Sequence, residues 1–324
     1  MRLVVGVDAG GTASKAVVTD LSGVVLGRGR AGPGNPSAVG PAAATAIRSA
    51  VRSALGTLDP GSVVAGVVGV AGVSALADPG VAASFSAAWS ALGLTGEMSV
   101  VGDAVTAFAA GGSGSKGAVL VSGTGAVAAL VDSLQVVRTA DGLGWLLGDE
   151  GSGMWLGLQA VRLSARRWST SVPPAAAWSA APSSPAPSLG FKSTLADVLD
   201  GLPALVGKVA AHAGVGSPDE LVHWAGGLPL ASFAALAPVV CASAEAGDPM
   251  AGRIVNDAVT RLIATLDELA APDDPVVLAG GLLVGDTPVR RGVLGVLRDR
   301  GVAVGLATDP ALGAARLAAV RARS

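Results

Sequence analysis

Short apolar runs separated by glycine-rich bends dominate the start of the chain. Residues 3–7 are apolar apart from one glycine, a bend follows at 8–12, and residues 16–20 are again mostly apolar. Valine-rich runs of this length, bounded by glycine, predict a strand, a tight turn and a second strand. Later runs predict further strands at 24–28, 62–70, 98–101, 117–121, 126–131, 275–279 and 302–306.

Stretches with helical spacing lie between these runs. Residues 42–55 contain neither glycine nor proline and follow Pro41, a residue that suits the start of a helix. Strands that alternate with helices predict an α/β fold with partly parallel sheets. The other predicted helices are 81–92, 104–110, 288–298 and 310–323, with mainly helical material over 192–271.

The same pattern occurs twice in the chain. VVGVDAGGTASKAVV near the start and AVLVSGTGAVAALV after residue 117 both read as strand, Gly/Thr turn and strand. We interpret this as an internal duplication with one copy opening each of two domains, because the separation is too long for a stacked-repeat protein. The chain, at 324 residues, is long enough for two domains of ordinary size.

Composition argues against several classes of protein. The net charge is −2 and there is no basic block, so neither nucleic acid nor an anionic membrane is an expected partner. Glycine, proline or serine interrupts every uncharged stretch, so none reads as a membrane span. Residues 171–190, rich in Pro, Ala and Ser, are expected to form a loose connection or a loop beside a cleft. The single cysteine, Cys241, rules out a disulfide framework, and a reducing, cytoplasmic location is expected.

Both glycine bends are suited to binding a triphosphate. Glycine lets backbone N–H groups approach phosphate oxygens, and threonine adds a hydroxyl donor. Asp8 precedes the first bend, where it is placed to hold a hydrated Mg²⁺, and Lys15 is placed to face the phosphates. The alternative is a pair of ordinary hairpins. A third strand that ends in Ala279-Gly280-Gly281 favours nucleotide binding.

Asp103 comes directly after the strand predicted at 98–101 and directly before a predicted helix. Carboxylates in this position often reach into a cleft, and phosphoryl transfer needs one such group to accept the proton of the attacking hydroxyl. A plain helix N-cap is the other interpretation of this residue, and both stay open at this point.

Five motifs, taken in order, resemble the actin-like ATPase superfamily of sugar kinases: VDAGGTASK, VVGDAVTA, VSGTG, GWLLGDEGSG and VVLAGG. The chain looks most like the N-acetylglucosamine kinase and BadF/BadG/BcrA/BcrD ATPase group. This resemblance runs from the first strand to the closing helix and weakens over about 165–270. It implies two ribonuclease-H-like domains with ATP between them. The first would comprise residues 1–112 and the closing helix 308–324, and the second residues 113–307.

The resemblance also implies roles for particular residues. Asp103 matches the family's catalytic base and Asn35 its sugar-contacting asparagine. Gly144, Trp145 and Asp149 match the family's substrate loop. The residues that match the nucleotide-binding motifs are Asp8, Gly10, Gly11, Thr12 and Lys15 in the first phosphate loop, Gly123, Thr124 and Gly125 in the second, and Gly280 and Gly281 in the adenosine motif.

Three acidic residues in the glycine-rich stretch 141–157 are expected to differ in role. Asp149 is the residue expected to contact the sugar. Glu150 is expected either to contact the sugar or, with Ser152, to serve the first turn of the following helix. Asp141 is expected to face solvent or to take part in a turn, and Trp145 to pack at the edge of a small polar ligand.

The expected activity is therefore that of an ATP- and Mg²⁺-dependent amino-sugar kinase acting on the 6-hydroxyl of N-acetylglucosamine. Glucosamine and N-acetylmuramate stay open as substrates, because Leu146-Leu147 replaces the His-Met of some relatives. An ATPase that switches conformation to act on a partner protein is an alternative of another class. It would need a cluster-binding cysteine pair or a dedicated partner surface. The resemblance also leaves a homodimer open.

Overall fold

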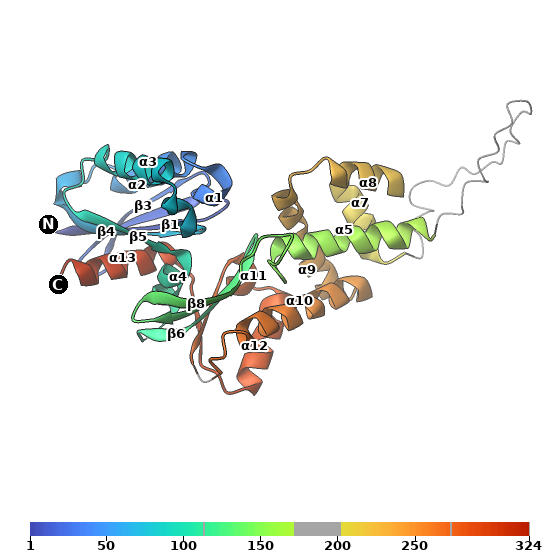
Figure 1. Ribbon diagram of the computed structural model, residues 1–324. Helices are drawn as coiled ribbons and strands as arrows, with labels where there is room; N and C mark the ends of the chain where they lie inside the picture. The colour runs from blue at the N-terminus through green and yellow to red at the C-terminus, as the bar shows by residue number, and fades with distance from the viewer. Residues whose placement is uncertain (113, 172–201, 273, 324) are drawn as a thin grey trace, which may run out of the picture.

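Two five-stranded sheets, one in each half of the molecule, organise the chain (Figure 1). The computed structural model describes residues 1–112, 114–171, 202–272 and 274–323. Apart from its first residue, the Pro/Ala/Ser segment predicted to form a loop lies outside the described residues.

The first sheet has the strand order β3-β2-β1-β4-β5. β1, β2 and β3 form an antiparallel meander, whereas β1, β4 and β5 run parallel. The carboxyl ends of the three parallel strands therefore share one edge of the sheet, and ligands of α/β proteins commonly bind at this edge. The strands are β1 (Leu3–Ala9), β2 (Ser14–Asp20), β3 (Val25–Ala31), β4 (Val63–Val70) and β5 (Glu97–Gly102).

The second sheet, of order β10-β9-β6-β7-β8, repeats this plan. β6, β7 and β8 are antiparallel, and β6, β9 and β10 are parallel. The predicted duplication is thus confirmed in the topology of the two sheets. β8 was not predicted, because its first five residues are exposed and show no alternation of buried and exposed positions. The strands are β6 (Lys116–Ser122), β7 (Ala126–Asp132), β8 (Gln135–Asp141), β9 (Val276–Ala279) and β10 (Val304–Leu306).

The helices agree closely with the predicted ranges, and α2 matches its prediction at both ends. In the first half they are α1 (Pro36–Val39), α2 (Ala42–Leu55), α3 (Pro79–Ser90) and α4 (Asp103–Gly111), with 3₁₀ turns at Pro60–Ser62 and Val73–Ala77. Those that follow are α5 (Gly153–Ser169), α7 (Ala204–Ala213), α8 (Pro218–Gly226), a 3₁₀ helix at Leu230–Leu236, α9 (Ala237–Glu245), α10 (Pro249–Asp267), α11 (Gly281–Val284), α12 (Pro288–Asp299) and α13 (Pro310–Arg321).

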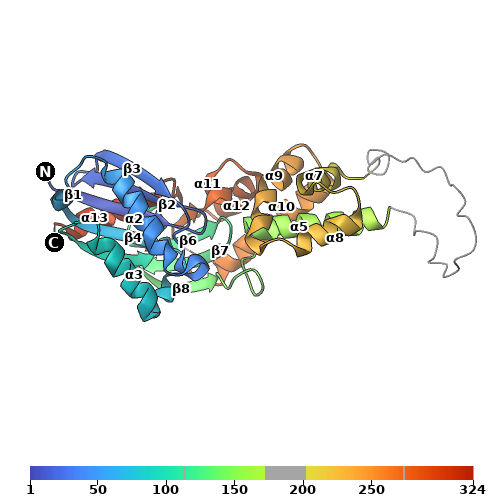
Figure 2. The same cartoon turned by 90° about the horizontal axis from the view of Figure 1, so that it is seen from above.

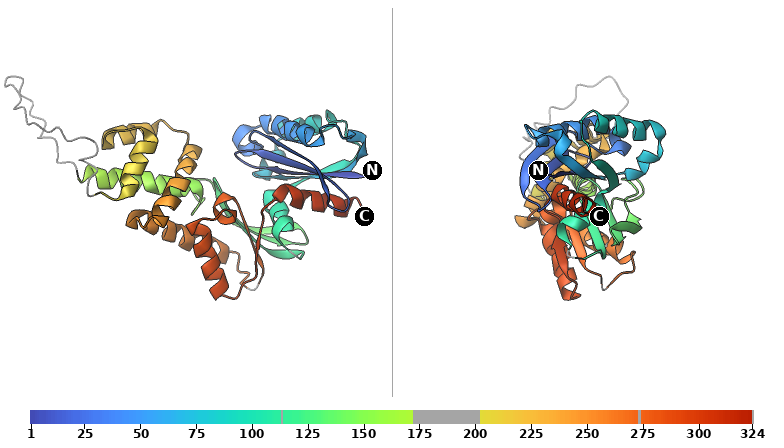
Figure 3. Two further views of the ribbon diagram at one scale, coloured as in Figure 1. Left: turned by 180° about the vertical axis from the view of Figure 1, so that it is seen from behind. Right: turned by 90° about the vertical axis from the view of Figure 1, so that its left-hand side faces the viewer.

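Helices α4 and α13 lie between the two sheets (Figures 1 and 3). α13 approaches β1 so closely that a Cβ on Gly6 would lie 2.1 Å from the Ala311 oxygen and 2.3 Å from the Ala315 nitrogen. α4 packs against the second sheet through the buried Phe108. The closing helix thus lies on the first sheet, and the domain boundaries expected at 112/113 and 307/308 remain a prediction.

The outer faces of both sheets are also covered. α2 and α3 close the far face of the first sheet around a core of valine, alanine and leucine. α5, α7, α8, α9 and α10 gather beyond the second sheet and share one large core with it (Figure 2). Both described ends of the chain lie beside the first sheet (Figure 1).

Candidate active site

The first glycine bend is a tight hairpin turn between β1 and β2. The Gly10 N–H donates to the Ala13 oxygen at 3.0 Å, which leaves Gly11 and Thr12 exposed at the tip. Asp8 and Lys15 are direct partners across the two strands. The residues predicted for the first phosphate loop are therefore brought together. The bend at 10–13 is called the phosphate-1 turn below, and the carboxylate of Asp8 and the ammonium group of Lys15 lie on the paired strands beside it.

Asp8 is a carboxyl with a raised pKa. Burial raises the pKa of Asp8 to about 6; Lys15 opposes that rise, whereas Asp103 and Asp309 add to it. Asp309 caps α13 and was not among the predicted site residues. An Asp-Pro pair before an alanine-rich helix is nevertheless an N-cap signal. A desolvated carboxyl near two other acids is a position that a bound cation would stabilise.

A second loop is tied to this turn. The Ser14 N–H donates to the Gly32 oxygen at 2.8 Å, and the Gly34 N–H donates to the Gly10 oxygen at 2.9 Å. A Cβ on Gly34 would lie 2.3 Å from the Ser14 hydroxyl, so only glycine fits here. The loop that carries Asn35 is thus fixed relative to the phosphate-1 turn.

Asn35 lies at the carboxyl end of β4. Its side-chain oxygen accepts from the Ser37 N–H at 2.8 Å and caps the short helix α1. The Ser37 hydroxyl donates to the Gly72 oxygen at 3.2 Å, which holds the loop against the residues that follow β4. The predicted sugar-contacting residue therefore stands at the same sheet edge as the phosphate-1 turn.

Asp103 follows β5 at this edge and is the first residue of α4. The N-cap position belongs to Gly102, so the interpretation of Asp103 as a plain N-cap is wrong. Its carboxylate accepts from the Ala104 N–H at 3.0 Å. Burial raises the pKa of Asp103, and the backbone hydrogen bond opposes this only in part. A partly buried carboxylate near Asp8 is suited to accept a proton from a hydroxyl.

The second glycine bend is held from two sides. The Gly153 N–H donates to the Gly123 oxygen at 2.7 Å, and the Ser122 hydroxyl donates to the Gly151 oxygen at 3.0 Å, which ties the bend to the start of α5. On the other side, Gly280 packs on the backbone of Ser122 and Gly123. The residues predicted for the second phosphate loop and for the adenosine motif are therefore brought together. The bend at 123–125 is called the phosphate-2 turn below. Within the described chain, no hydrogen bond joins them to the phosphate-1 turn.

Gly280 is expected to be irreplaceable for this contact. Its φ is +84°, and a Cβ would lie 2.3 Å from the Ser122 oxygen. Gly280→Ala should lower the free energy of unfolding by about 3 kcal/mol in urea denaturation, through backbone strain and overpacking. Gly281→Ala is the matched control, because a Cβ there meets nothing within 4 Å. Equal stability of the two variants would contradict this account.

Asp141 takes part in a turn as expected, because its carboxylate accepts from the Leu143 N–H at 3.5 Å, and it also organises the whole loop between β8 and α5. Its carboxylate accepts from the Asp149 N–H at 2.6 Å and from the Glu150 N–H at 2.8 Å. A Cβ on Gly148 would lie 2.0 Å from the same carboxylate. Asp141 therefore closes the loop at its base by hydrogen bonds that span eight and nine residues, which a local turn does not require.

Asp149 connects this loop to the second glycine bend. Its carboxylate accepts from the Ala126 N–H at 3.0 Å and lies against Gly125. Burial raises the pKa of Asp149, and the nearby Asp141 adds to the rise. Asp149, predicted to contact the sugar, thus has a structural role, because it links the loop between β8 and α5 to the second glycine bend.

Glu150 and Ser152 differ from each other in role. Glu150 forms an ion pair with Arg261 on α10, and the Arg261 guanidinium lies 5.1 Å from the centre of the Trp155 ring. Ser152 caps α5 by accepting from the Trp155 N–H at 3.1 Å. The structure thus assigns the helix cap to Ser152 alone and turns Glu150 toward α10.

The tip of the loop is apolar and exposed. Trp145 is 44% exposed, and Leu143, Leu146 and Leu147 are more exposed still, at 66%, 72% and 75%. Gly144 has a φ of +80° and supports the bend between them. The structure therefore does not bring the Trp145 ring into the buried part of the site, unlike Asp149.

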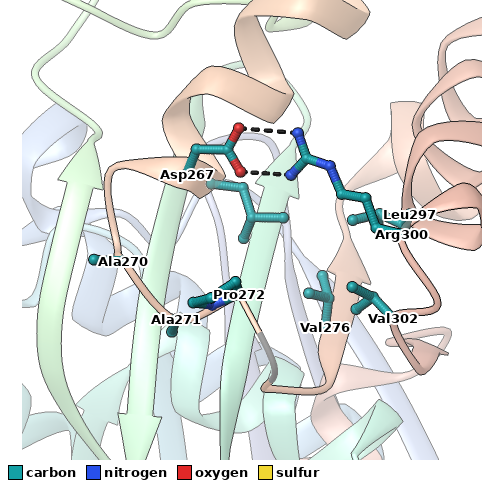
Figure 4. A pocket seen from close by; sticks show the side chains of 9 residues that line it. Asp267, Ala270, Ala271, Pro272, Val276, Leu297, Arg300 and Val302 are labelled. Carbon is teal, nitrogen blue, oxygen red and sulfur yellow. Dashed lines mark hydrogen bonds and ion pairs between the residues drawn. The ribbon is translucent and has the colours of Figure 1, made fainter.

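A cavity of about 310 Å³ lies elsewhere, between the end of α10, β9 and α12 (Figure 4). Asp267 and Arg300 form an ion pair with two hydrogen bonds beside it, at 2.6 and 3.0 Å. None of the residues predicted for the nucleotide or the sugar lines this cavity. Among the described residues, no three His, Cys, Asp or Glu side chains gather so as to hold a metal ion by themselves.

Within the described ranges, no single helix is long and apolar enough to cross a bilayer. The segments Leu230–Glu245 and Pro249–Asp267 pass that test only as a pair, and they are bent by 115° at their junction.

Two sheets of one repeated topology, each with a glycine bend between its first two antiparallel strands, define the actin-like ATPase fold that the sequence motifs predicted. The model of the BadF/BadG/BcrA/BcrD ATPase family matches residues 5–318. The chain belongs to this family, which confirms the resemblance drawn from the motifs.

Individual relatives agree with this assignment. The N-acetylmuramic acid/N-acetylglucosamine kinase of Clostridium acetobutylicum is 25% identical over 295 residues, or 87% of this chain and 86% of the relative. A protein of Chromobacterium violaceum, provisionally assigned as an N-acetylglucosamine kinase, is 25% identical, with a TM-score of 0.73 over 98% of this chain and 99% of its own. The ROK-family glucokinase of Streptomyces griseus, solved with glucose and AMPPNP, shares the fold at 19% identity, with a TM-score of 0.55 and coverage of 98% and 99%.

Proposed function

We propose that the chain is an ATP-dependent amino-sugar kinase that phosphorylates the 6-hydroxyl of N-acetylglucosamine. The observation that carries this proposal is the position of Asp103, a partly buried carboxylate at the sheet edge that also presents Asn35 and Asp8. The kinases named among the relatives support the same class of reaction.

In the proposed reaction Asp103 accepts the proton of the sugar hydroxyl. The hydroxyl oxygen forms a bond to the γ-phosphorus of ATP, and the bond from that phosphorus to the bridging oxygen breaks, which releases ADP. The backbone N–H groups at the tips of the two glycine bends, those of Gly11, Thr12, Thr124 and Gly125, are the proposed donors to the phosphates. Gly280 and Gly281 are the proposed contacts of the adenosine.

Asp8 is the proposed holder of Mg²⁺, through water. The carboxyl fits this role, because burial raises its pKa to about 6 and Asp103 and Asp309 lie near enough to raise it further, so a cation would relieve the excess of negative charge. Magnesium in such sites is held by one or two carboxylates together with substrate phosphates. When bound, it would neutralise charge on the phosphates.

Two other amino sugars are alternatives to N-acetylglucosamine as the substrate. N-acetylmuramate and glucosamine are the alternatives, and the first gains support from the name of the Clostridium relative. The proposed domains, 1–112 with 308–324 and 113–307, would place the sugar in the first and the adenosine in the second. A cytoplasmic location belongs to the same proposal, since a single cysteine suits a reducing compartment.

The alternative of a conformational-switch ATPase is less favoured. A metal cluster shared between subunits would need exposed cysteines. Cys241 is only 7% exposed in α9, and burial raises the pKa of its thiol to about 11. Such a thiol is a poor ligand, because the thiolate is the metal-binding form.

A panel of sugars tests the proposal. The full chain is incubated with Mg-ATP and N-acetylglucosamine, N-acetylmuramate, glucosamine or glucose, and ADP release is followed. We expect turnover of about 1–1,000 s⁻¹ on at least one amino sugar and slower turnover on glucose. ADP release that no amino sugar accelerates would overturn the proposal and favour the switch ATPase.

A further inference from the structure

One row of charged residues crosses the first three strands beside the phosphate-1 turn. Asp8 pairs with Lys15 across β1 and β2, and Lys15 pairs with Arg30 across β2 and β3. Lys15 and Arg30 are both exposed. Lys15 was among the predicted site residues and Arg30 was not, because only the strand register brings the two together.

The row faces the second half of the molecule. Arg28, two residues before Arg30, forms an ion pair of 2.7 Å with Asp309 at the start of α13. Side chains two apart in a strand leave the same face of the sheet, so Arg30 lies on the α13 side as well. Asp309 also acts on the pKa of Asp8, which places Asp8 on this side too. α13 lies between the two sheets (Figure 3).

Arg30 also lies next to both loops of the proposed site. The pair that follows it in the ladder, Ser14 and Ala31, is the last before the chain leaves the sheet. Beyond that pair the loop at 32–35 bonds to the turn at 10–13. A guanidinium at this position stands beside the phosphate-1 turn, on the face of the sheet that carries α13.

The two cations are unfavourable neighbours in the free protein. Side chains directly opposite on adjacent strands have Cβ atoms about 4.5–5.5 Å apart, and like charges at this distance destabilise the sheet. Lys15 has Asp8 nearby, whereas the side chain of Arg30 forms no hydrogen bond or ion pair with any other described residue. An anion bound between Lys15 and Arg30 would turn this repulsion into attraction.

We propose that Arg30 binds a terminal phosphate of ATP beside Lys15, as a second cation of the phosphate-1 turn. The planar guanidinium can donate two parallel hydrogen bonds to phosphate oxygens, which a lysine cannot do. The inference rests on the proposed function in one respect, which is that the ligand is a nucleotide. An exposed cation on an edge strand can also serve only to prevent strand pairing, and such a residue would not affect nucleotide binding.

The test compares Arg30→Gln with Arg52→Gln by calorimetry in the absence of sugar. Arg52 is exposed on α2, on the opposite face of the same sheet, so the second variant carries the same charge change away from the row. Arg30→Gln should bind Mg-ATP about tenfold more weakly, as expected for the loss of a charged hydrogen bond, and adenosine with unchanged affinity. Arg52→Gln should match the wild type for both ligands. Arg30→Lys should recover part of the loss.

Thermal unfolding provides a second readout. Without ligand, Arg30→Gln should melt at the wild-type temperature or above it, because a repulsion is removed. The rise in melting temperature with Mg-ATP should be smaller than in the wild type. Wild-type affinity of Arg30→Gln for Mg-ATP overturns the inference, as does an equal loss of ATP and adenosine binding. A loss of activity that is confined to the turnover of N-acetylmuramate, which is an acidic sugar, also overturns the inference. The proposed function fails separately, if the wild type phosphorylates no amino sugar.

Discussion

Asp103→Asn is expected to lower kcat about 10³-fold while the KM for the amino sugar changes little, since general-base catalysis contributes about 10²–10⁴-fold. Asparagine keeps the size of the side chain and the acceptor for the Ala104 N–H, but it cannot take a proton. Steady-state kinetics with coupled detection of ADP measure both constants. Asp257→Asn, on the exposed face of α10, is the control for an acid removed elsewhere. Retention of kcat in Asp103→Asn would show that another group is the base.

The same residue sets a direction for the pH dependence. Burial raises the pKa of Asp103, so the deprotonated base is lost at a higher pH than for an exposed aspartate, and activity should fall as pH decreases through that range. Asp8, with a pKa of about 6 in the free protein, adds to the same acidic limb. The residual activity of Asp103→Asn should keep only the part of the limb that Asp8 provides, displaced to lower pH because Asp103 no longer raises the pKa of Asp8.

Asp141→Ala is expected to lower kcat/KM about 100-fold, although Asp141 lies at the base of the substrate loop. The substitution leaves the N–H groups of Asp149 and Glu150 without their acceptor, and hydrogen bonds to a charged group are worth about 1.5–3 kcal/mol each. It also places alanine at a φ of +61°, which aspartate and asparagine tolerate better. Released from Asp141, Asp149 would no longer be held against the phosphate-2 turn.

The matched variant for this prediction is Asp141→Asn. Asparagine keeps one acceptor oxygen and tolerates the same backbone conformation, so its loss should be intermediate, about tenfold. Amide hydrogen exchange should show faster exchange over 142–150 in Asp141→Ala than in Asp141→Asn. Wild-type kinetics and exchange in the alanine variant would mean that the loop needs no closure by Asp141.

Local pattern was sufficient for most of the fold. The bends at Gly10 and Gly123 and the valine-rich runs around them identified the paired hairpins, because glycine and β-branched residues act within a few residues of the chain. α2 follows its prediction because Pro41 precedes it and residues 42–55 contain neither glycine nor proline. β8 was missed because it is an edge strand whose exposed side chains carry no periodic signal.

The parts of the site that the sequence did not reveal depend on contacts between distant residues. Asp141 lies among glycines and looks like a turn residue until its two backbone partners are seen. Arg30 becomes part of the site only through its register with Lys15. Asp309 reaches the neighbourhood of Asp8 only because α13 returns to the first sheet. None of these relations follows from spacing along the chain.

The most direct test of the proposed activity is the product itself. The wild-type chain is incubated with Mg-ATP and N-acetylglucosamine, and the mixture is analysed by ³¹P and proton-coupled NMR. We expect a sugar monophosphate whose phosphorus couples to the two protons on carbon 6, formed in equal amount to ADP and about 10³-fold more slowly with Asp103→Asn. ADP that appears together with inorganic phosphate, and without any phosphorylated amino sugar, would contradict the account.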